Sequence, residues 1–359
     1  MPIFDKSKIR KDVLQIIERN LKIQAEAGIE YAARSDLRGI DLQECMRRVV
    51  RGNKKYFENL ENGRPAHDQL RDTLTHRDMV QVARLFRFAF DRLADYYLNQ
   101  PGFPPEIRID KVDLDGIPAE WQVVGGSEPD RVLLYFHGGG QVMGSTLSHR
   151  WLTAKLGEIT GMRVLSVEYR LAPEHPFPAG VEDSFRAYRW LLEQGVQAEH
   201  IVIGGDSAGG NQAIATLLQI RDARIASPAG AFVLSPAIDY TTECETIYTN
   251  RQTDHLSSVG VFWWDQAYLA GADPRHPLIS PVHAALHGLP PLLIQVTTNE
   301  IVYDHSTRLA ERAAAAGVDV TLQQWDGLMH VWQHHGLYEL PESKEALNNI
   351  KEFVERVVG

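Results

Sequence analysis

The pattern with the clearest chemical meaning is Gly-x-Ser-x-Gly, which occurs at residues 205–209 as Gly-Asp-Ser-Ala-Gly. It follows an apolar stretch typical of a buried strand, residues 201–203, and precedes a helical pattern over residues 211–224. A sharp turn from strand to helix has no room for side chains two residues before and after the serine, which explains glycine at both places. Such a nucleophile elbow exposes the serine hydroxyl at the carboxyl end of the strand, so the pattern predicts Ser207 as a nucleophile.

A chance match is the competing explanation for this pattern. At ordinary frequencies of glycine and serine, a chain of this length contains about 0.1 such match by accident. The strand before the motif and the helix after it make accident a weaker explanation still. In the elbow geometry the backbone N–H of Ala208 faces the oxygen of a bound carbonyl group, and the start of the helix adds positive potential there.

A second glycine-rich motif, His-Gly-Gly-Gly at residues 137–140, directly follows the apolar strand that ends at Phe136. Consecutive glycines allow backbone N–H groups to approach and face a ligand, as an oxyanion hole requires. An ordinary glycine-rich loop is the alternative, but the two motifs occur in the right order on the expected elements. We expect His137 itself to fix the loop through hydrogen bonds and to take no part in the chemistry.

A serine nucleophile needs a base, which in this arrangement comes late in the chain, after an acid. Residues 318–325 are predicted to form the last strand and His330 follows them, so His330 is the expected base. His334 and His335 are rivals, although we expect them in the first turn of the next helix. The spacing of His330 and His334 also fits a metal pair, but neither an intervening glutamate nor a cysteine cluster supports that interpretation.

The acid is expected just beyond the apolar strand at residues 292–296, where two carboxylates occur. Glu300 lies nearer to the end of the strand, where a loop residue can reach the imidazole, and is the favoured acid. Asp304 follows one helical turn later and is expected to cap or solvate the next helix.

These residues need a scaffold, and the chain shows two kinds of periodicity. Up to about Leu98, apolar residues recur with helical spacing in three stripes, and the proline-rich residues 100–105 end that pattern. Residues 107–114 and 119–124 alternate as an antiparallel pair would, and buried strands then alternate with helices. We predict a helical region at 1–104 and, at 105–359, an α/β-hydrolase fold with a mostly parallel sheet flanked by helices.

Composition excludes several classes of protein. The formal net charge of −10 disfavours nucleic acid as a partner, and no stretch approaches the roughly 20 apolar residues of a membrane span. Cys45 and Cys244 lie too far apart in sequence to suggest a disulfide framework, and the charged start does not resemble a signal peptide. We therefore expect a cytoplasmic protein that needs no metal or organic cofactor.

The motifs together resemble those of a known family. Besides the two glycine-rich motifs, Tyr-Arg-Leu-Ala-Pro-Glu-His-Pro-Phe-Pro-Ala at 169–179, Leu-Pro-Pro at 289–291 and Val-Trp after His330 are similar to the hormone-sensitive-lipase-like branch of the α/β-hydrolases. The resemblance extends from about residue 105 to the end of the chain. The 169–179 stretch is then expected to be a structural strap beneath the site.

This resemblance implies a carboxylesterase that prefers short acyl chains and carries a helical cap over its active site. It implies Ser207 as nucleophile, His330 as base, and oxyanion donors at Gly138, Gly139 and Ala208. The cap would comprise the helical region at 1–104 and an insertion at about 239–275.

The chain departs from the family pattern in two places. The branch usually has aspartate where this chain has Glu300, and Asp304 matches its second aspartate four residues later. The helical region before residue 105 is longer than the usual cap. The family pattern gives no role for its extra helix.

The expected reaction is transfer of a short- to medium-chain acyl group from an ester to Ser207 and then to water. An amidase or a carbamate hydrolase would use the same residues. A non-catalytic receptor for a small molecule is a less favoured alternative, because such a receptor should have lost a member of the triad. The expected partner is a small-molecule ester, and a homodimer is a further expectation.

Aromatic side chains in the insertion are candidates for the wall of the pocket. Phe262, Trp263 and Trp264 occur there in a row, and Trp332 follows His330 closely. Each of them has core packing as its competing role.

Overall fold

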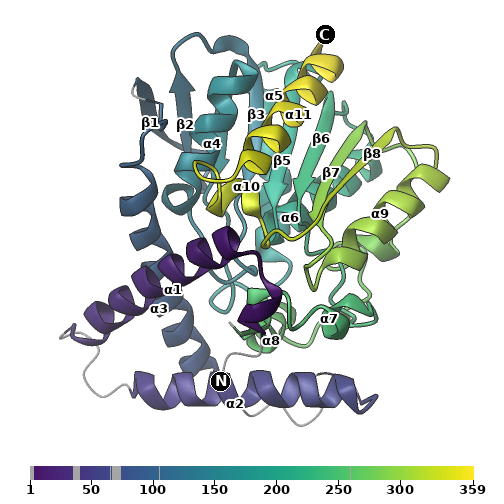
Figure 1. The fold of residues 1–359 in the computed structure, drawn as a ribbon. Helices are drawn as coiled ribbons and strands as arrows, with labels where there is room; N and C mark the ends of the chain where they lie inside the picture. Colours follow the sequence, from purple (N-terminus) through teal and green to yellow (C-terminus); the bar gives the residue numbers. More distant parts are fainter. Residues whose placement is uncertain (1–3, 35–40, 65, 67–73, 105, 259) are drawn as a thin grey trace.

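The central element of the fold is one mixed sheet. A computed structural model describes residues 4–34, 41–64, 66, 74–104, 106–258 and 260–359. Within them, eight strands form a sheet in the order β1-β2-β4-β3-β5-β6-β7-β8 (Figure 1). The pairs β1–β2 and β2–β4 are antiparallel and all other neighbours are parallel. The strands are β1 (Ile107–Asp113), β2 (Pro118–Val124), β3 (Glu128–Phe136), β4 (Met162–Val167), β5 (Ile201–Asp206), β6 (Gly230–Leu234), β7 (Leu292–Thr297) and β8 (Val320–Trp325).

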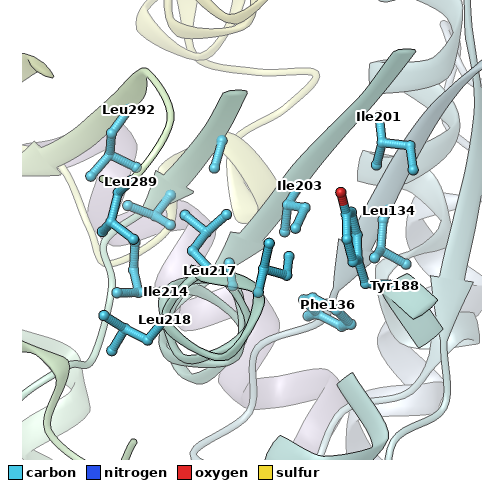
Figure 2. Packing of buried hydrophobic residues seen from close by; sticks show 14 of the residues in the cluster. Leu134, Phe136, Tyr188, Ile201, Ile203, Ile214, Leu217, Leu218, Leu289 and Leu292 are labelled. Carbon is cyan, nitrogen blue, oxygen red and sulfur yellow. The ribbon is translucent and has the colours of Figure 1, made fainter. Parts of the chain in front are cut away.

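Alternate residues of a strand face opposite sides of the sheet. Because the central strands are apolar at consecutive positions, both faces of the sheet are apolar. On β3, Leu134 and Phe136 belong to one buried cluster, whereas Leu133 and Tyr135 belong to another. Figure 2 shows the first cluster, in which strand side chains pack against those of covering helices. These helices are α5 (Ala179–Glu193), α6 (Ala208–Asp222) and α9 (Tyr303–Ala315) on the first face, and α4 (Thr146–Thr160) and α11 (Pro341–Val358) on the second. The predicted α/β-hydrolase fold, with its mostly parallel covered sheet, is confirmed.

The region before the sheet is helical, as its apolar stripes predict. It contains η1 (Lys6–Lys8), α1 (Lys11–Ala32), α2 (Leu42–Glu61) and α3 (His76–Tyr97). Asp41 caps α2 by accepting the N–H of Glu44, and Thr75 and Asp78 form a capping box at the start of α3. Among the described residues, we find no helix with the length and apolarity to cross a membrane.

An insertion between β6 and β7 packs against this helical region. It carries α7 (Thr246–Thr249), η4 (His255–Ser258) and α8 (Val261–Leu269), and Figure 1 shows α2 beside α7 and α8. A Cβ atom at Gly52 of α2 would lie 2.3 Å from the Phe262 ring of α8, so the two helices pack closely at this glycine. Helices from both segments therefore share one hydrophobic cluster.

The predicted division of the chain falls between α3, which ends at Tyr97, and β1, which begins at Ile107. Pro105, the first residue of the predicted catalytic domain, lies outside the described residues. The division into 1–104 and 105–359, with an insertion at about 239–275, stays a prediction. The described residues also form the short elements η3 (Ala198–His200), η5 (Pro281–His283) and α10 (Trp332–His335).

Candidate active site

Ser207 occupies the sharp turn between β5 and α6 that the sequence predicts. Its backbone has φ 51° and ψ −118°, a conformation that residues with a side chain rarely adopt. A Cβ atom at Gly205 would lie 2.3 Å from the carbonyl oxygen of Gly209, and one at Gly209 would lie 2.0 Å from that of Phe136. Both glycines are therefore required by the turn, which holds the serine at the carboxyl end of β5.

His330 and Glu300 are in direct contact, although they come from different loops. His330 Nδ1 lies 2.6 Å from Glu300 Oε2, and both residues are buried. Burial by itself lowers the pKa of His330, but the charge of Glu300 and its hydrogen bond outweigh that effect and raise this pKa above its ordinary value. The other ring nitrogen, Nε2, has no hydrogen-bond partner among the described residues. The imidazole is thus oriented through one nitrogen and available through the other.

The Glu300 carboxylate is also fixed on its second oxygen. Oε1 accepts hydrogen bonds from the Ser235 hydroxyl at 2.7 Å and from the Thr297 N–H at 3.0 Å. Asp304, the alternative acid, instead accepts the N–H of Thr246 at 3.1 Å, near the start of α9. The structure therefore brings Glu300 and not Asp304 to His330.

The rival histidines have other partners. His334 Nε2 lies 3.0 Å from the Ser148 carbonyl oxygen, and burial lowers the pKa of His334 to about 3. His335 Nδ1 lies 3.5 Å from the amide nitrogen of Asn20. In the part of the chain that the structure describes, no group of three or more His, Cys, Asp or Glu side chains is arranged to hold a metal ion.

The glycine-rich loop is joined to the residue before the nucleophile. The N–H of Gly138 donates to Asp206 Oδ1 at 3.1 Å, and Asp206 also accepts from the Tyr135 hydroxyl at 2.8 Å. A Cβ atom at Gly138 would lie 2.2 Å from Asp206 Oδ2, so only glycine fits there. The prediction of Gly138 as an oxyanion donor is therefore wrong, because its N–H is already used.

Asp206 carries the negative charge of this network inside the protein. Burial by itself raises the pKa of Asp206, but His149 and the hydrogen bonds outweigh it and hold this pKa well below its ordinary value. His149 Nε2 lies 3.3 Å from Asp206 Oδ2. His137 has the structural role predicted for it, because its Nδ1 lies 2.8 Å from the Gly138 carbonyl oxygen and its ring stacks on Tyr169.

Two cavities meet at Ser207, with empty volumes of about 810 and 590 Å³ that include space open to solvent. Gly140, Leu256 and Trp264 also line both. The larger cavity contains His330 and Gly139 and is bounded by one face of α1 and by α3, through Ile17, Asn20, Leu21, Gln24, Phe86 and Phe90. The smaller one is lined mainly by the insertion and by the loop after β7, including Tyr240, Ile247, Val261, Ile301 and Val302.

Of the four aromatic residues predicted for the pocket wall, the structure places one beside the cavities and three in a hydrophobic core. Trp264 lies against the glycine-rich loop, where a Cβ atom at Gly140 would be 2.8 Å from its indole ring. Phe262 and Trp263 are fully buried among residues of the helical region. Trp332 is also fully buried, with its ring centre 5.0 Å from that of Trp325. The predictions for these three residues are wrong, because their neighbours form a core and not a cavity.

Sequence reasoning missed two kinds of residue. The α1 face of Ile17, Asn20, Leu21 and Gln24 has the i, i+3, i+4, i+7 spacing of a helix stripe, but that spacing does not say what the stripe faces. Gly140 was within the recognised glycine motif, and only the packing of the loop distinguishes it from Gly138.

Comparison with known proteins shows which family the chain resembles. Residues 133–334 match a family model described as alpha/beta hydrolase fold. An acetyl-hydrolase of Streptomyces hygroscopicus is 41% identical over 275 residues, which cover 76% of this chain and 90% of that protein. A solved esterase from the bacterial hormone-sensitive lipase family superposes with a TM-score of 0.74 at 37% identity, covering 87% of this chain and 99% of that one. The esterase EstE5, soaked with p-nitrophenyl butyrate, gives a TM-score of 0.70 at 37% identity and covers 78% of this chain and 98% of that one.

Proposed function

Since this chain belongs to the α/β-hydrolase family, in its hormone-sensitive-lipase-like branch of esterases, we propose that it hydrolyses esters through an acyl-enzyme on Ser207. The observation that carries the proposal is the 2.6 Å contact between His330 Nδ1 and Glu300, with Nε2 of the same imidazole unpartnered among the described residues. His330 and Ser207 line one cavity. An oriented base beside a serine in an elbow is the arrangement that nucleophilic catalysis needs.

The catalytic cycle has two acyl-transfer steps. His330 takes the proton of Ser207 as its oxygen attacks the ester carbonyl carbon, and then returns that proton to the departing alcohol. Glu300 keeps the proton on Nδ1 of His330, so that Nε2 is free to accept, and stabilises the imidazolium. Water then repeats the sequence on the acyl-enzyme and releases the acid.

The oxyanion of the tetrahedral intermediate needs hydrogen-bond donors. We assign this role to the backbone N–H groups of Gly139, Gly140 and Ala208, and not to Gly138, whose N–H donates to Asp206. Gly139 and Gly140 line the cavity beside Ser207, and Ala208 is the first residue of α6, where the helix adds positive potential. One such donor is worth about 10²–10³ in rate.

The two cavities suggest how an ester lies in the site. The departing alcohol must receive its proton from His330, which lines the larger cavity. The alcohol portion is therefore assigned to the larger cavity and the acyl group to the smaller one. A limited acyl cavity favours short- to medium-chain acyl groups, because burial gains about 0.8 kcal/mol per methylene only until the space is full.

Two of the similar proteins point toward short acyl groups. One carries the name acetyl-hydrolase, and the other was soaked with a butyrate ester. By analogy, we propose acetate to butyrate esters as the preferred class. Cytoplasmic location and a homodimer stay predictions from the sequence.

The direct test is to trap the acyl-enzyme. Incubation with p-nitrophenyl acetate and rapid acid quenching should add one acetyl group to the peptide that contains Ser207, as seen by mass spectrometry. Ser207→Ala should lose at least about 10⁴ in kcat and should not be acetylated. Full turnover by Ser207→Ala would overturn the proposal, and faster hydrolysis of the matching anilide than of the ester would favour an amidase.

A further inference from the structure

The turn that carries Glu300 is held by hydrogen bonds from the insertion. Asn250 Nδ2 donates to the carbonyl oxygens of Thr298 and Glu300, each at 2.8 Å. The Thr253 hydroxyl lies 3.0 Å from the carbonyl oxygen of Asn299. One short segment therefore contacts three successive carbonyl groups of this turn.

The same segment also binds the N–H that follows Glu300. Asp254 Oδ2 accepts the N–H of Ile301 at 2.9 Å, and Asp254 Oδ1 accepts that of Leu256 at 3.0 Å. Asp254 is 3% exposed, so these bonds form away from bulk water. Buried backbone groups need partners, and here the partners come from side chains of another loop.

We propose that Asn250, Thr253 and Asp254 are positioning residues that hold Glu300 in register with His330. The inference rests on the proposed function, in which Glu300 orients the catalytic imidazole. None of the three contacts the substrate in this proposal. They act through the backbone of residues 298–301.

The physical reason is the precision that the contact requires. Glu300 lies beyond the end of β7, so the ladder of the sheet does not fix its backbone. A displacement of the turn by about 1 Å would lengthen the 2.6 Å contact with His330, and misplacements of that size cost up to about 10²-fold in rate. A set of hydrogen bonds on both sides of Glu300 prevents such a displacement.

The carboxylate of Asp254 also affects His330 electrostatically. It acts to raise the pKa of His330, and burial raises the pKa of Asp254 itself to about 6. Removal of this carboxylate should therefore make His330 easier to deprotonate. The titratable and charged groups that interact with Asp254 or with His330 are Glu300, His255, Asp206, His305 and His335.

Residues 250–257, which include the three positioning residues, also contact the N-terminal helical region. The N–H of Asp5 donates to the Gln252 carbonyl oxygen at 2.7 Å, and Asn53 Nδ2 donates to that of Ser257 at 2.5 Å. Arg251 and Glu61 form an ion pair. The helical region is thus linked to the turn at Glu300 by the contacts of residues 250–257, and it also forms part of the wall of the larger cavity.

Matched substitutions at two positions test the hydrogen bonds. Asn250→Asp keeps the size of the side chain but replaces its donor by an acceptor, and Thr253→Val keeps the shape but removes the hydroxyl. We expect each to lower kcat about 10- to 100-fold on p-nitrophenyl acetate, with KM changed by less than about 2-fold. Thr253→Ser, which keeps the hydroxyl, should restore most of the rate.

The control for these variants is Thr249→Val, because Thr249 is exposed and its hydroxyl donates to the carbonyl oxygen of Glu245, the residue before α7, at 3.2 Å. Rates are expressed per site titrated with an organophosphate, so unfolded protein does not enter them. Unchanged kcat in both Asn250→Asp and Thr253→Val would overturn the inference. A loss in Thr253→Ser equal to that in Thr253→Val would also overturn it.

Asp254→Asn tests the charge, because its amide oxygen can still accept the N–H of Ile301, whereas the N–H of Leu256 loses its acceptor at Asp254 Oδ1. We expect the acidic limb of the kcat/KM profile to move to lower pH by about half a unit or more. Asp273→Asn, at an exposed position of the insertion, should leave the profile unchanged. An unmoved profile in Asp254→Asn would remove the electrostatic part of the inference. Failure of the proposed function would differ, because the wild-type chain would then lack hydrolysis that depends on Ser207.

Discussion

The Gly138 N–H donates to Asp206 Oδ1 at 3.1 Å, which links the glycine-rich loop to the residue that precedes Ser207. This buried hydrogen bond therefore joins the two loops that meet in the proposed oxyanion hole. Because Asp206 also accepts from Tyr135, its side chain holds the loop and β3 together. Changes at Asp206 should therefore affect catalysis without removing a reacting group.

Asp206→Ala should destabilise the protein and slow turnover together. It leaves the buried hydroxyl of Tyr135 without its acceptor, and it leaves the N–H of Gly138 with the longer contact of 3.3 Å to His149 Nε2. An unsatisfied buried group costs about 1–3 kcal/mol. Urea unfolding and kcat on p-nitrophenyl acetate measure the two effects. Asp206→Asn keeps an acceptor oxygen for Gly138 and should lose less of both. An Asp206→Ala enzyme with wild-type stability would show that the hydrogen bonds of Asp206 do not stabilise the fold.

Glu300→Gln should lower kcat by up to about 10⁴ with little change in KM, because a wrong imidazole tautomer affects only proton transfer. Asp304→Asn is the matched control, since the Asp304 carboxylate contacts Thr246 and should matter far less. Steady-state kinetics on one ester compares the two variants. A reversed ranking, with Asp304→Asn the more damaging change, would contradict the assignment of the acid.

Activity should decrease as the pH is lowered, with a midpoint above pH 6.5. The catalytic form of His330 is neutral, and Glu300 raises the pKa of His330 above its ordinary value of 6.5 despite its burial. As pH falls through this raised pKa, the imidazole gains a proton and loses its function as a base. The kcat/KM profile from pH 5 to 9 measures the midpoint. A midpoint well below 6.5 would show that burial, and not Glu300, dominates.

Trp264→Ala should broaden acyl specificity. The indole lines both cavities and lies against Gly140, so its removal joins the two spaces beside Ser207. We expect the ratio of kcat/KM for octanoate to that for acetate to rise about 10-fold or more, which corresponds to filling a few methylene-sized sites. Trp121→Ala is a suitable control, because Trp121 lies on β2 with the Arg163 guanidinium over its ring and lines neither of the two cavities. An unchanged chain-length profile would mean that Trp264 does not separate the two groups of an ester.

Much of the fold was predictable because it is encoded in consecutive residues. The apolar strands, the helical stripes before Tyr97 and the glycines at 205 and 209 all express local steric and burial requirements. The position of Ser207 in its turn follows from those requirements alone. His330 was found in the same way, from its place after the last strand.

Other features depend on pairs of residues far apart in the chain, and sequence patterns did not contain them. Whether Gly138 or Gly140 offers a free N–H depends on Asp206, and whether Trp264 or Trp263 lines the cavity depends on where α2 and α3 pack. The hydrogen bond from Asn250 to the carbonyl oxygen of Glu300 likewise joins residues that are 50 positions apart in the chain. A local pattern states which backbone conformation a segment prefers. The partner of a buried hydrogen bond or aromatic ring is decided only when the chain folds, because packing and hydrogen bonding act on whichever groups the fold brings within a few ångströms.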